Sequence, residues 1–523
     1  MTLQCRIGLV YLPGALPCFE SFGNLPTDVV RADAEIDGKP FSEVLDMLII
    51  PGGSLVESQS VNPKVASEII KMADKGKFIL GVCSGFQVLA KETDVGRLST
   101  IPVIRSGLGL LDAEFKPLIC TDRVKADVTG ESFLTRDIGK QVNGFHCHTY
   151  GDVVVGQDAK RILVTHADRI NYFEKGKSLV SGVSNRSGNV VGVFIHGLLD
   201  SNPLITQGIM NSLDIRQTDL KVIHEANAEF IRGIKCEVGV ATGIYPKQQV
   251  RQKTAKVLMV TALGSGSGKT FLVTGIAGAL KKVGWNVGVV KVGGDVRDIV
   301  PALYLTKEPM KEDSSIRVGS TGWTPLEQVM QAGGRDYDFL LVEGAMNAFT
   351  GLLNDNNKRP MSTVEVAAAS GANTVLVVAC NQTGLEGALL DTVSNIAALK
   401  HLGVNVVGVI LNKLHISYMT KETVSLMQRA FANVGVQLIG TVPKLDLEHR
   451  GMIPEVEIRY EDFCSQAVEA VEENLNLKLL AEVAAPAEPV AVDYKALSEE
   501  FKNLLTGASP KSGKAANTSG NQA

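Results

Sequence analysis

Apolar residues in the first 215 positions gather in short runs that end in glycine turns and lead into helical segments. Examples are RIGLVYL, DMLIIPGG and KFILGVCSG. Continuous apolar runs of this length predict strands of a parallel sheet that is covered on both faces. From residue 255 the pattern restarts with the runs KVLMVTA, NVGVVKVG, DFLLVEG, NTVLVVAC, VVGVILNK and QLIGTVPK. Strands that alternate with helices in this way predict two α/β domains.

Polar segments set the limits of these domains. Residues 216–254 carry a charged amphipathic piece followed by a polar run, which is typical of a connector. From about residue 481 the chain is rich in Ala, Pro, Ser, Gly and Asn and has few large apolar side chains. We therefore predict two doubly wound, mostly parallel sheet domains at 1–215 and 255–480, a linker at 216–254 and a mostly disordered C-terminal tail at 481–523. Within the tail, a short helix is expected near YKALSEEFKNLL.

The composition of the chain limits the classes of partner that it is expected to bind and the compartment in which it is expected to be found. The net charge of −4 provides no field that would attract nucleic acid or an anionic membrane. No apolar run reaches the length of about 18 residues that a membrane-spanning helix needs, and the N-terminus is typical of a buried strand. The 8 cysteines are scattered without a CxxC pair, which favours a reducing compartment. We therefore expect a cytoplasmic protein without nucleic-acid or membrane partners.

The segment TALGSGSGKT, residues 261–270, has the composition of a phosphate-binding loop. Its glycines allow backbone N–H groups to approach phosphates, and the start of the following helix adds its dipole. Gly-Ser runs also form linkers, but the strand before and the helix after this one favour nucleotide binding. The usual spacing has Gly at position 263, where this chain has Leu263. The predicted phosphate-binding residues are Gly264, Ser265, Gly266, Ser267, Gly268, Lys269 and Thr270.

Acidic residues follow two of the predicted strands in this second domain. Asp295 and Asp298 lie in KVGGDVRDIV, and Glu343 ends the apolar run of LLVEG. Open α/β sheets bind ligands at the carboxyl ends of their strands, and a carboxylate there is the expected second anchor for Mg²⁺. Alone, each acid is more typical of a solvated loop. Their order after the phosphate-binding loop favours a Mg²⁺ site formed by Thr270, Asp295 and Glu343.

A cysteine stands on a predicted strand-to-helix turn in the first domain. Cys83 lies in GVCSGFQVLA, where small neighbours permit a tight turn and the helix start favours a thiolate. His196 follows a strand far downstream and is a candidate base. Gly52 and Gly53 offer backbone amides for an oxyanion hole. A lone cysteine is usually a core residue and a lone histidine a hydrogen-bonded one, so this prediction depends on the three segments together.

The segment GFHCHTYGD contains His146, Cys147 and His148, a combination that could suggest zinc. Successive side chains on a strand point to opposite faces, so these three do not face one point. We therefore expect a local structural or substrate-side role for His148.

These motifs resemble the family of cobyrinic acid a,c-diamide synthases and cobyric acid synthases. The phosphate-binding loop, KVGGDVRD, EGAM, STVEVA and GVILNK resemble its ATP-binding domain, which is related to dethiobiotin synthetase. GVCSGFQ, FIHGLLD and GFHCH resemble its class I glutamine amidotransferase domain. The chain departs from the family in its domain order, which is reversed, and in having GGDVRD where relatives have GPDYID.

The resemblance implies roles for individual residues. Those implied in handling ATP and Mg²⁺ are Lys269, Thr270, Asp295, Asp298 and Glu343, with Asn412 and Lys413 near the adenine. Those implied on the substrate side are Lys291, Arg297 and Asp298. Arg297 can pair with a substrate carboxylate or, alternatively, point to solvent or pair with Asp298.

The third member of the cysteine–histidine site is left open by the resemblance. Ordinary class I amidotransferases have an acid two residues after the histidine, and this chain has Leu198 there. Asp200 is a candidate to orient the ring.

The resemblance implies a glutamine-hydrolysing carbon–nitrogen ligase. Mg²⁺-ATP would phosphorylate a carboxylate of a tetrapyrrole, and ammonia from glutamine would form the amide. Cobyrinic acid a,c-diamide synthesis is the first choice, and cobyric acid synthesis and nickel-sirohydrochlorin a,c-diamide synthesis are the alternatives. A dethiobiotin-synthetase-like ligase and a P-loop ATPase switch, each with a degenerate amidotransferase domain, are further hypotheses, against which the intact Cys83 and His196 argue. The oligomeric state stays open, with a homodimer as one option.

Overall fold

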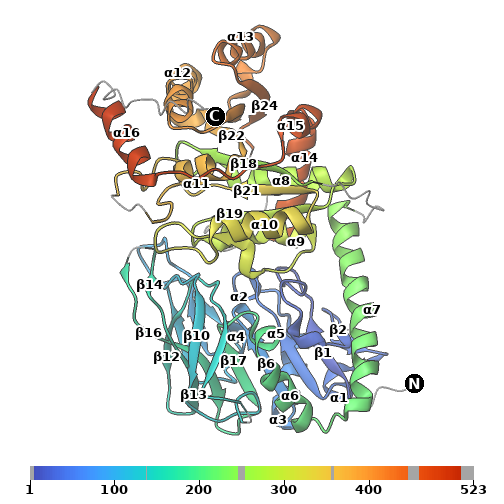
Figure 1. The fold of residues 1–523 in the computed structure, drawn as a ribbon. Coiled ribbons are helices and arrows are strands. Elements are labelled where there is room, and N and C mark those ends of the chain that lie inside the picture. Colours follow the sequence, from blue (N-terminus) through green and yellow to red (C-terminus); the bar gives the residue numbers. More distant parts are fainter. Residues whose placement is uncertain are drawn as a thin grey trace, which may run out of the picture.

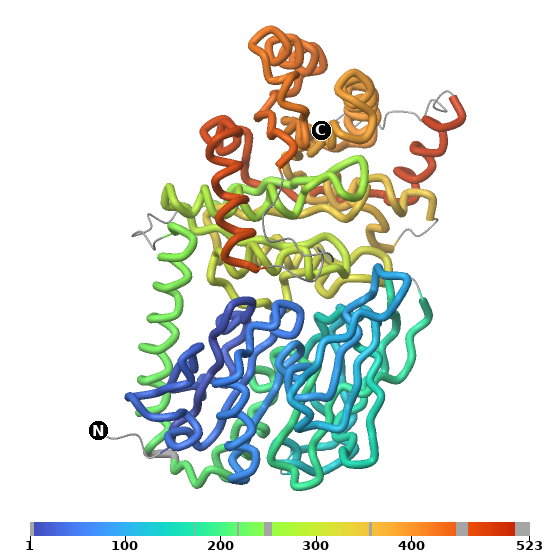
Figure 2. Tube along the Cα trace, turned by 180° about the vertical axis from the view of Figure 1, so that it is seen from behind, coloured from blue at the N-terminus to red at the C-terminus, as the bar shows by residue number. Residues whose placement is uncertain are grey.

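The computed structural model describes residues 5–136, 138–172, 174–244, 254–354, 358–445 and 459–507. Two α/β domains are stacked on one another, the N-terminal one in blue to cyan and the C-terminal one in yellow to red (Figure 1). The view from behind shows the same two layers, with helix α7 (Gln217–Thr242) along one side of both (Figure 2). The predicted division into two α/β domains is therefore confirmed.

The first domain contains a mixed nine-stranded sheet. Its order is β11 (Gln141–Phe145), β10 (Arg123–Val128), β13 (Ala159–His166), β16 (Ser178–Asn185), β17 (Val190–Val193), β6 (Phe78–Val82), β5 (Met47–Ile50), β1 (Ile7–Val10) and β2 (Asp28–Val30). The strands from β17 to β2 pair in parallel, whereas those from β11 to β17 pair antiparallel. The parallel half consists of the apolar runs that the sequence pattern predicts, and β1, β5 and β17 are buried throughout. The apolar runs do not predict the antiparallel half of this sheet.

The second domain contains a seven-stranded sheet in which every pairing is parallel. Its order is β20 (Ser315–Ile316), β19 (Val287–Val292), β21 (Phe339–Glu343), β18 (Lys256–Ala262), β22 (Asn373–Ala379), β23 (Val406–Leu414) and β24 (Gln437–Pro443). After β18 the chain builds β19 to β21 on one side of it and then β22 to β24 on the other. Such a reversal opens a crevice at the carboxyl ends of the strands, where this fold binds ligands.

Helices cover both faces of this second sheet. One apolar core lies between the sheet and α8 (Lys269–Lys282), α9 (Val300–Thr306) and α14 (Tyr460–Asn474). The other core lies between the opposite face and α10 (Leu326–Asp336), α11 (Thr363–Ser370), α12 (Cys380–His401) and α13 (Lys421–Ala432). Burial of both faces explains why these strands are continuous apolar runs.

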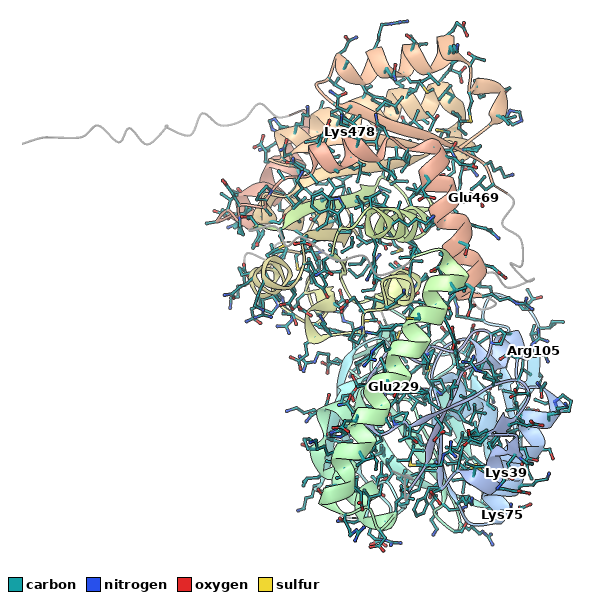
Figure 3. The ribbon with its side chains drawn as sticks, turned by 90° about the vertical axis from the view of Figure 1, so that its right-hand side faces the viewer. Lys39, Lys75, Arg105, Glu229, Glu469 and Lys478 are labelled. Atoms are coloured by element: carbon teal, nitrogen blue, oxygen red, sulfur yellow. The ribbon has the colours of Figure 1, made fainter. Side chains whose placement is uncertain are left out.

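The connector between the domains is largely the single helix α7. Ile223 packs in the core of the first domain, whereas Ile234 and Val238 pack in a core of the second. Figure 3 shows this helix beside both domains, with Glu229 near its middle. Residues 245–253 of the predicted linker lie outside the described residues. Among the helices that the structure describes, α7 included, none is long and apolar enough to cross a membrane.

The ordered part of the second domain extends beyond the predicted boundary at residue 480. Ala485 forms a bridge with Val257 beside the sheet, and α16 (Tyr494–Thr506) packs through Phe501 against Phe349. Helix α16 occupies the segment for which the sequence predicts a short helix. Residues 508–523, the remainder of the predicted tail, lie outside the described residues.

Candidate active site

Cys83 occupies a strained turn between β6 and the helix α4 (Ser84–Leu89). Its backbone has φ 51° and ψ −108°, a combination that L-residues rarely adopt. The amide of Cys83 donates to the carbonyl of Val193 on β17 at 2.8 Å, and this bond helps to hold the turn. The thiol points toward the carbonyl oxygen of Cys147 at 3.6 Å. The sharp turn expected at this cysteine is therefore present.

His196 and Gly52 lie next to this cysteine. A Cβ atom at Gly52 would lie 2.6 Å from Cε1 of His196 and 3.4 Å from Cβ of Cys83, so only glycine fits between them. Gly53 lines the cavity in front of the thiol. Phe145 stacks on the imidazole of His196 with ring centroids 5.3 Å apart. The structure therefore brings together the cysteine, the histidine and the two glycines that the sequence singled out.

Glu20 is the third member of this group. His196 Nδ1 donates to Glu20 Oε1 at 2.9 Å, and the amide of Gly197 donates to Glu20 Oε2 at 2.7 Å. Asp200 does not take this place, because it accepts from the amides of Ser21 and Gly23 at 2.8 and 2.7 Å. It thereby fixes the loop that carries Glu20. The sequence offers no spacing signal for this pair, since 176 positions separate Glu20 from His196.

Burial of this site changes the expected state of the thiol. Burial raises the pKa of Cys83 well above its ordinary value, so the thiol is protonated near neutral pH. The sequence favoured a thiolate at the helix start, but α4 has only six residues and the cost of burying the charge is larger. The nucleophile therefore needs a neighbouring base, and the imidazole of His196, held by Glu20, is the group beside it.

The phosphate-binding loop lies between β18 and α8 and is braced from the end of β23. Gly268 has φ 86°, and a Cβ atom there would lie 2.3 Å from Nδ2 of Asn412. Asn412 donates to the carbonyl of Ser267 at 2.8 Å, and Lys413 donates to the carbonyl of Gly266 at 2.7 Å. Both side chains therefore hold the loop. Their contact with adenine remains a prediction.

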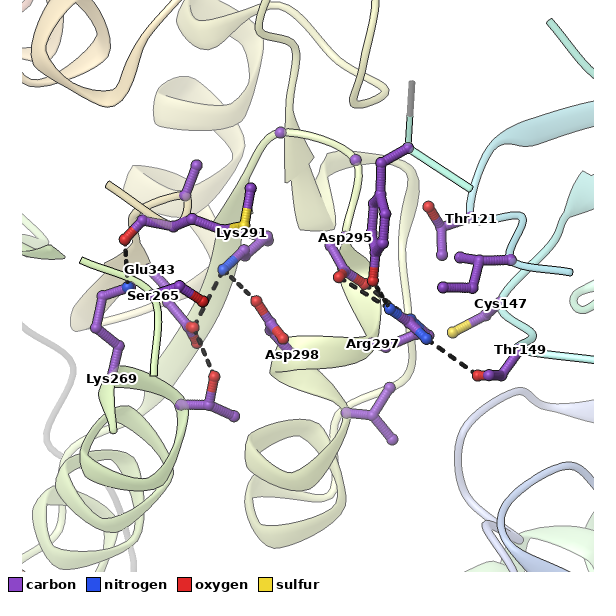
Figure 4. A pocket seen from close by; sticks show the side chains of 18 of the residues that line it. Thr121, Cys147, Thr149, Ser265, Lys269, Lys291, Asp295, Arg297, Asp298 and Glu343 are labelled. Atoms are coloured by element: carbon purple, nitrogen blue, oxygen red, sulfur yellow. Dashed lines mark hydrogen bonds and ion pairs between the residues drawn. The ribbon is translucent and has the colours of Figure 1, made fainter. Parts of the chain in front are cut away.

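Four side chains meet at the carboxyl ends of β18, β19 and β21 (Figure 4). Thr270 Oγ1 donates to Glu343 Oε1 at 2.8 Å. Lys291 Nζ lies 3.1 Å from the same oxygen and 2.5 Å from Asp298 Oδ2. Glu343 is 1% exposed, and among the described residues its other oxygen, Oε2, has no hydrogen-bond partner. Lys269 lies beside this group and donates to the carbonyl of Met346 at 2.8 Å.

Burial and neighbouring charges set the protonation of the two lysines. Burial, together with the positive charge of Lys291, lowers the pKa of Lys269 to about 8. Burial also opposes the charge on Lys291, but the carboxylates of Asp298 and Glu343 outweigh it and raise its pKa above the ordinary value. Burial raises the pKa of Asp298 to about 6 despite the attraction of Lys291. Lys291 therefore stays charged, whereas Lys269 becomes neutral above about pH 8.

Asp295 and Arg297 lie apart from this group and reach toward the first domain (Figure 4). Arg297 binds both oxygens of Asp295, through Nε at 2.9 Å and Nη2 at 3.0 Å. It also donates to Thr149 at 3.0 Å and to the hydroxyl of Tyr172. Of the three predicted Mg²⁺ ligands, the structure thus brings Thr270 and Glu343 together and holds Asp295 with Arg297. Arg297 therefore pairs with Asp295. The alternatives that the sequence left open were Asp298, solvent and a substrate carboxylate.

One cavity of about 1050 Å³ joins the two groups of residues. Cys83 and His196 line it from the first domain, and Lys269, Lys291 and Glu343 line it from the second. Apolar contacts beside the cavity join the domains. Phe145 and Trp323, one from each domain, have ring centroids 5.1 Å apart. The elbow cysteine and the phosphate-binding loop therefore open into the same space.

Curated proteins with similar sequences match only part of the chain. Cobyric acid synthase from Dehalococcoides mccartyi is 30% identical over 220 residues, which are 40% of this chain and 41% of the relative. Hydrogenobyrinate a,c-diamide synthase from Mycobacterium tuberculosis is 31% identical over 206 residues, which are 38% of this chain and 43% of the relative. The chain thus spans about two fifths of the length of the curated relatives that it matches.

Solved structures also align with one part of the chain each. PurLQS from Thermotoga maritima has a TM-score of 0.31 at 23% identity and covers 40% of this chain and 99% of its own. The septum site-determining protein MinD with Mg-ADP from Pyrococcus horikoshii has a TM-score of 0.26 at 17% identity. It covers 49% of this chain and 99% of its own.

Family comparisons assign both domains. Residues 10–204 match the CobB/CobQ-like glutamine amidotransferase domain. Residues 258–450 match the CobQ/CobB/MinD/ParA nucleotide binding domain. The chain therefore joins a first domain that matches a CobB/CobQ-like glutamine amidotransferase domain to a second that matches a CobQ/CobB/MinD/ParA nucleotide binding domain.

Proposed function

We propose that this protein is an ATP- and glutamine-dependent amide synthase. The observation that carries the proposal is the cavity shared by Cys83 in the amidotransferase domain and Lys269 in the nucleotide-binding domain. Ammonia is largely protonated in neutral water and is then no nucleophile. A space shared by the two sites shortens the path of ammonia to an activated carboxylate and so lowers the chance that it takes up a proton.

The first half-reaction takes place at the elbow. His196 takes the proton of Cys83, and the sulfur attacks the side-chain amide carbon of glutamine. Backbone amides near Gly52 and Gly53 stabilise the oxyanion. The tetrahedral intermediate collapses to a thioester, and ammonia leaves with a proton returned by His196. Water then cleaves the thioester and releases glutamate, while Glu20 keeps the imidazole oriented throughout.

The second half-reaction takes place at the phosphate-binding loop. Its backbone amides and Lys269 bind the phosphates of ATP and stabilise the charge that develops during phosphoryl transfer. The orphaned Oε2 of Glu343 and the hydroxyl of Thr270 fit a hard cation, which supports binding of Mg²⁺ here. Glu343 and Thr270 would hold the ion, which would supply positive charge to offset that of the phosphates. The acceptor carboxylate takes the γ-phosphoryl group, and ammonia displaces phosphate from the acyl phosphate to leave an amide.

The acceptor that we propose is a tetrapyrrole with several carboxylates. Relatives of the chain include synthases of cobyric acid and of hydrogenobyrinate a,c-diamide. A cavity of about 1050 Å³ lies at the upper end of the range for small-molecule sites, as a large ring requires. Lys291, Arg297 and Asp298 line it on the acceptor side. Cobyrinic acid, which would become its a,c-diamide, is the first choice, with cobyric acid precursors and a nickel-sirohydrochlorin as alternatives.

The experiment that tests the proposal is a product assay with ATP, Mg²⁺, glutamine and a panel of these tetrapyrrole acids. Mass spectrometry should find an amide formed in step with ADP and glutamate. Phosphate release without any amide would instead indicate an ATPase switch protein.

Glu20→Gln should lower the glutaminase kcat on the order of 10²-fold, because general acid–base catalysis contributes about that much. Gln keeps the size of the side chain but removes the negative charge beside His196 Nδ1. The KM for glutamine should change little. Glu131→Gln, which changes an exposed acid of the same domain, should retain most of the activity. Equal rates for Glu20→Gln and wild type would show that Glu20 does not contribute to catalysis.

Nucleotide affinity should weaken as the pH rises above about 8. In the nucleotide-free protein the pKa of Lys269 is lowered to about 8, and bound phosphate favours the charged amine. Binding above this pH therefore requires uptake of a proton. The Kd for a non-hydrolysable Mg²⁺-ATP analogue should be flat below about pH 8 and then rise up to about tenfold per pH unit. Lys269→Arg should abolish the slope, and an unchanged slope in that variant would assign it to another group.

A further inference from the structure

A second cluster of reactive side chains lies in the wall of the amidotransferase domain. Cys120, His146 and His148 are 2%, 0% and 3% exposed. Their candidate ligand atoms all lie within 4.8 Å of one another. All eight cysteines lie within the described residues and carry free thiols, so Cys120 is available as a ligand.

Backbone pairing brings these three side chains to one face. Cys120 and His148 are antiparallel partners, with N–H to carbonyl bonds of 3.2 and 3.1 Å in the two directions. Directly opposed residues project to the same face, and His146, two positions before His148, projects there as well. Because side chains alternate along the chain, Cys147 projects to the face opposite the two histidines. Cys120, from the neighbouring segment, projects to the same face as the histidines. Sequence spacing alone could not reveal this cysteine.

The hydrogen bonds of His148 use one ring nitrogen and leave the other without a partner among the described residues. Its Nδ1 lies 3.3 Å from the carbonyl oxygen of Leu118. A carbonyl only accepts, so Nδ1 carries the proton and Nε2 carries the lone pair. Although Nε2 is buried, it has no hydrogen-bond partner in the described part of the chain. Donation of the other ring N–H to a backbone carbonyl is the usual arrangement of a metal-binding histidine.

The hydrogen bonds of His146 likewise leave the lone pair of one ring nitrogen available to a metal, and here that nitrogen is Nδ1. Its Nε2 lies 3.1 Å from Oγ of Ser181, which donates its own proton to Thr165 at 2.8 Å. Nε2 therefore donates to Ser181, and the lone pair is on Nδ1. That nitrogen lies 3.4 Å from Sγ of Cys120.

We propose that Cys120 Sγ, His146 Nδ1 and His148 Nε2 bind a single Zn²⁺ ion. A thiolate and two imidazoles suit Zn²⁺ and not the hard cations Mg²⁺ and Ca²⁺. Tetrahedral bonds of about 2.0–2.3 Å place ligand atoms roughly 3.3–3.8 Å apart. The pair at 3.4 Å already meets this spacing, and the rest of the cluster needs to contract by only about 1 Å.

An ion bound at this position would stabilise the structure around it. Cys120 precedes Thr121, whose carbonyl accepts from Trp323 of the second domain at 3.0 Å. Between the two histidines lies Cys147, whose carbonyl faces the thiol of Cys83 at 3.6 Å. Bound Zn²⁺ would therefore fasten the interdomain contact to the wall of the glutamine site. Cys120 and His148 also line the shared cavity, which leaves room for a fourth ligand.

The test uses the full-length Cys83→Ala protein, so that Zn²⁺ cannot bind at the elbow thiol. After treatment with a chelator, the protein is incubated with Zn²⁺ alone, freed of excess metal and analysed by atomic emission. We expect one equivalent of Zn²⁺, and with Co²⁺ a thiolate-to-cobalt charge-transfer band. Added Zn²⁺ should also raise the Tm. Absence of stoichiometric metal and of the cobalt band would overturn the proposal, whether or not any variant folds.

Matched variants assign the ligands. Cys120→Ser and His148→Gln, in the same background, should each weaken Zn²⁺ binding at least tenfold and remove the increase in Tm. Cys464→Ser changes another buried cysteine, in the second domain, and should retain one equivalent. His166→Gln changes an exposed histidine and should do the same. Retention of Zn²⁺ by both cluster variants would place the ion elsewhere and overturn the assignment.

Discussion

Cys83→Ala is expected to abolish glutamine-driven amidation while leaving amidation from high concentrations of ammonium salt close to that of the wild type. The glutamine-driven rate should fall on the order of 10³-fold or more, because the thioester forms on the sulfur of Cys83. The ammonium-driven rate should change by no more than about twofold, since the nucleotide site lies in the other domain. Both rates are obtained from the amide product by mass spectrometry.

The ammonium-driven rate also reports on folding of the Cys83→Ala protein. Cys464→Ala, which removes another buried thiol, should leave both rates unchanged. Loss of both rates in Cys83→Ala alone would show that Cys83 supports the fold or that the two half-reactions are inseparable. A retained glutamine-driven rate would show that the nucleophile is another residue.

Lys269→Ala and Glu343→Gln should each lower amidation on the order of 10²-fold or more with either nitrogen source. Lys269 is placed to bind the phosphates, and Glu343 is bonded to both Thr270 and Lys291. Glutaminase activity should survive at a reduced rate, because Cys83 and His196 are intact. The measurement is the amide formed from glutamine and from ammonium, with glutamate release assayed in parallel.

Lys282→Ala is the matched control for Lys269. Lys282 lies at the far end of α8, where its amine pairs with Glu472 at 2.9 Å at the surface. This variant should stay within about twofold of wild type, as is usual for surface ion pairs. A Lys269→Ala or Glu343→Gln protein within a few-fold of wild type would remove that residue from the site.

The strands of the second domain could be predicted because both of their faces are buried. β18 and β19 are covered on each side by helices, so their sequences are mostly apolar. Loops after such strands have strong composition signals. The glycine-rich loop at Gly264–Gly268 and the turn at Cys83 could therefore be located from the sequence.

The antiparallel half of the first sheet could not be predicted from apolar runs. β10 alternates exposed and buried residues, because one of its faces meets water. Alternation over five or six residues is a weaker signal than a continuous run. The segment after residue 481 combines a composition typical of a disordered tail with a short helix-forming stretch near YKALSEEFKNLL. Composition averages over its length, whereas Phe501 and its neighbours in α16 supply a single apolar face.

Contacts that depend on the path of the chain in the fold account for the rest of the candidate site. Glu20 is a single acid in a loop, and only the fold brings it to His196. The pairing of Asp295 with Arg297, and of Asp298 with Lys291, depends on the path of one short turn. Cys120 joins His146 and His148 only through strand pairing. Such groupings are set by tertiary structure and leave no local pattern.

The most direct test of the shared cavity is the origin of the amide nitrogen. The protein is supplied with ATP, Mg²⁺, a cobyrinic-type polycarboxylate, glutamine labelled with ¹⁵N in the side-chain amide, and an equal concentration of unlabelled ammonium near neutral pH. If ammonia passes from Cys83 to the nucleotide site within the cavity, nearly all of the amide product carries ¹⁵N. Product with the isotopic composition of the free ammonium, or no amide with any acceptor tested, would contradict the account.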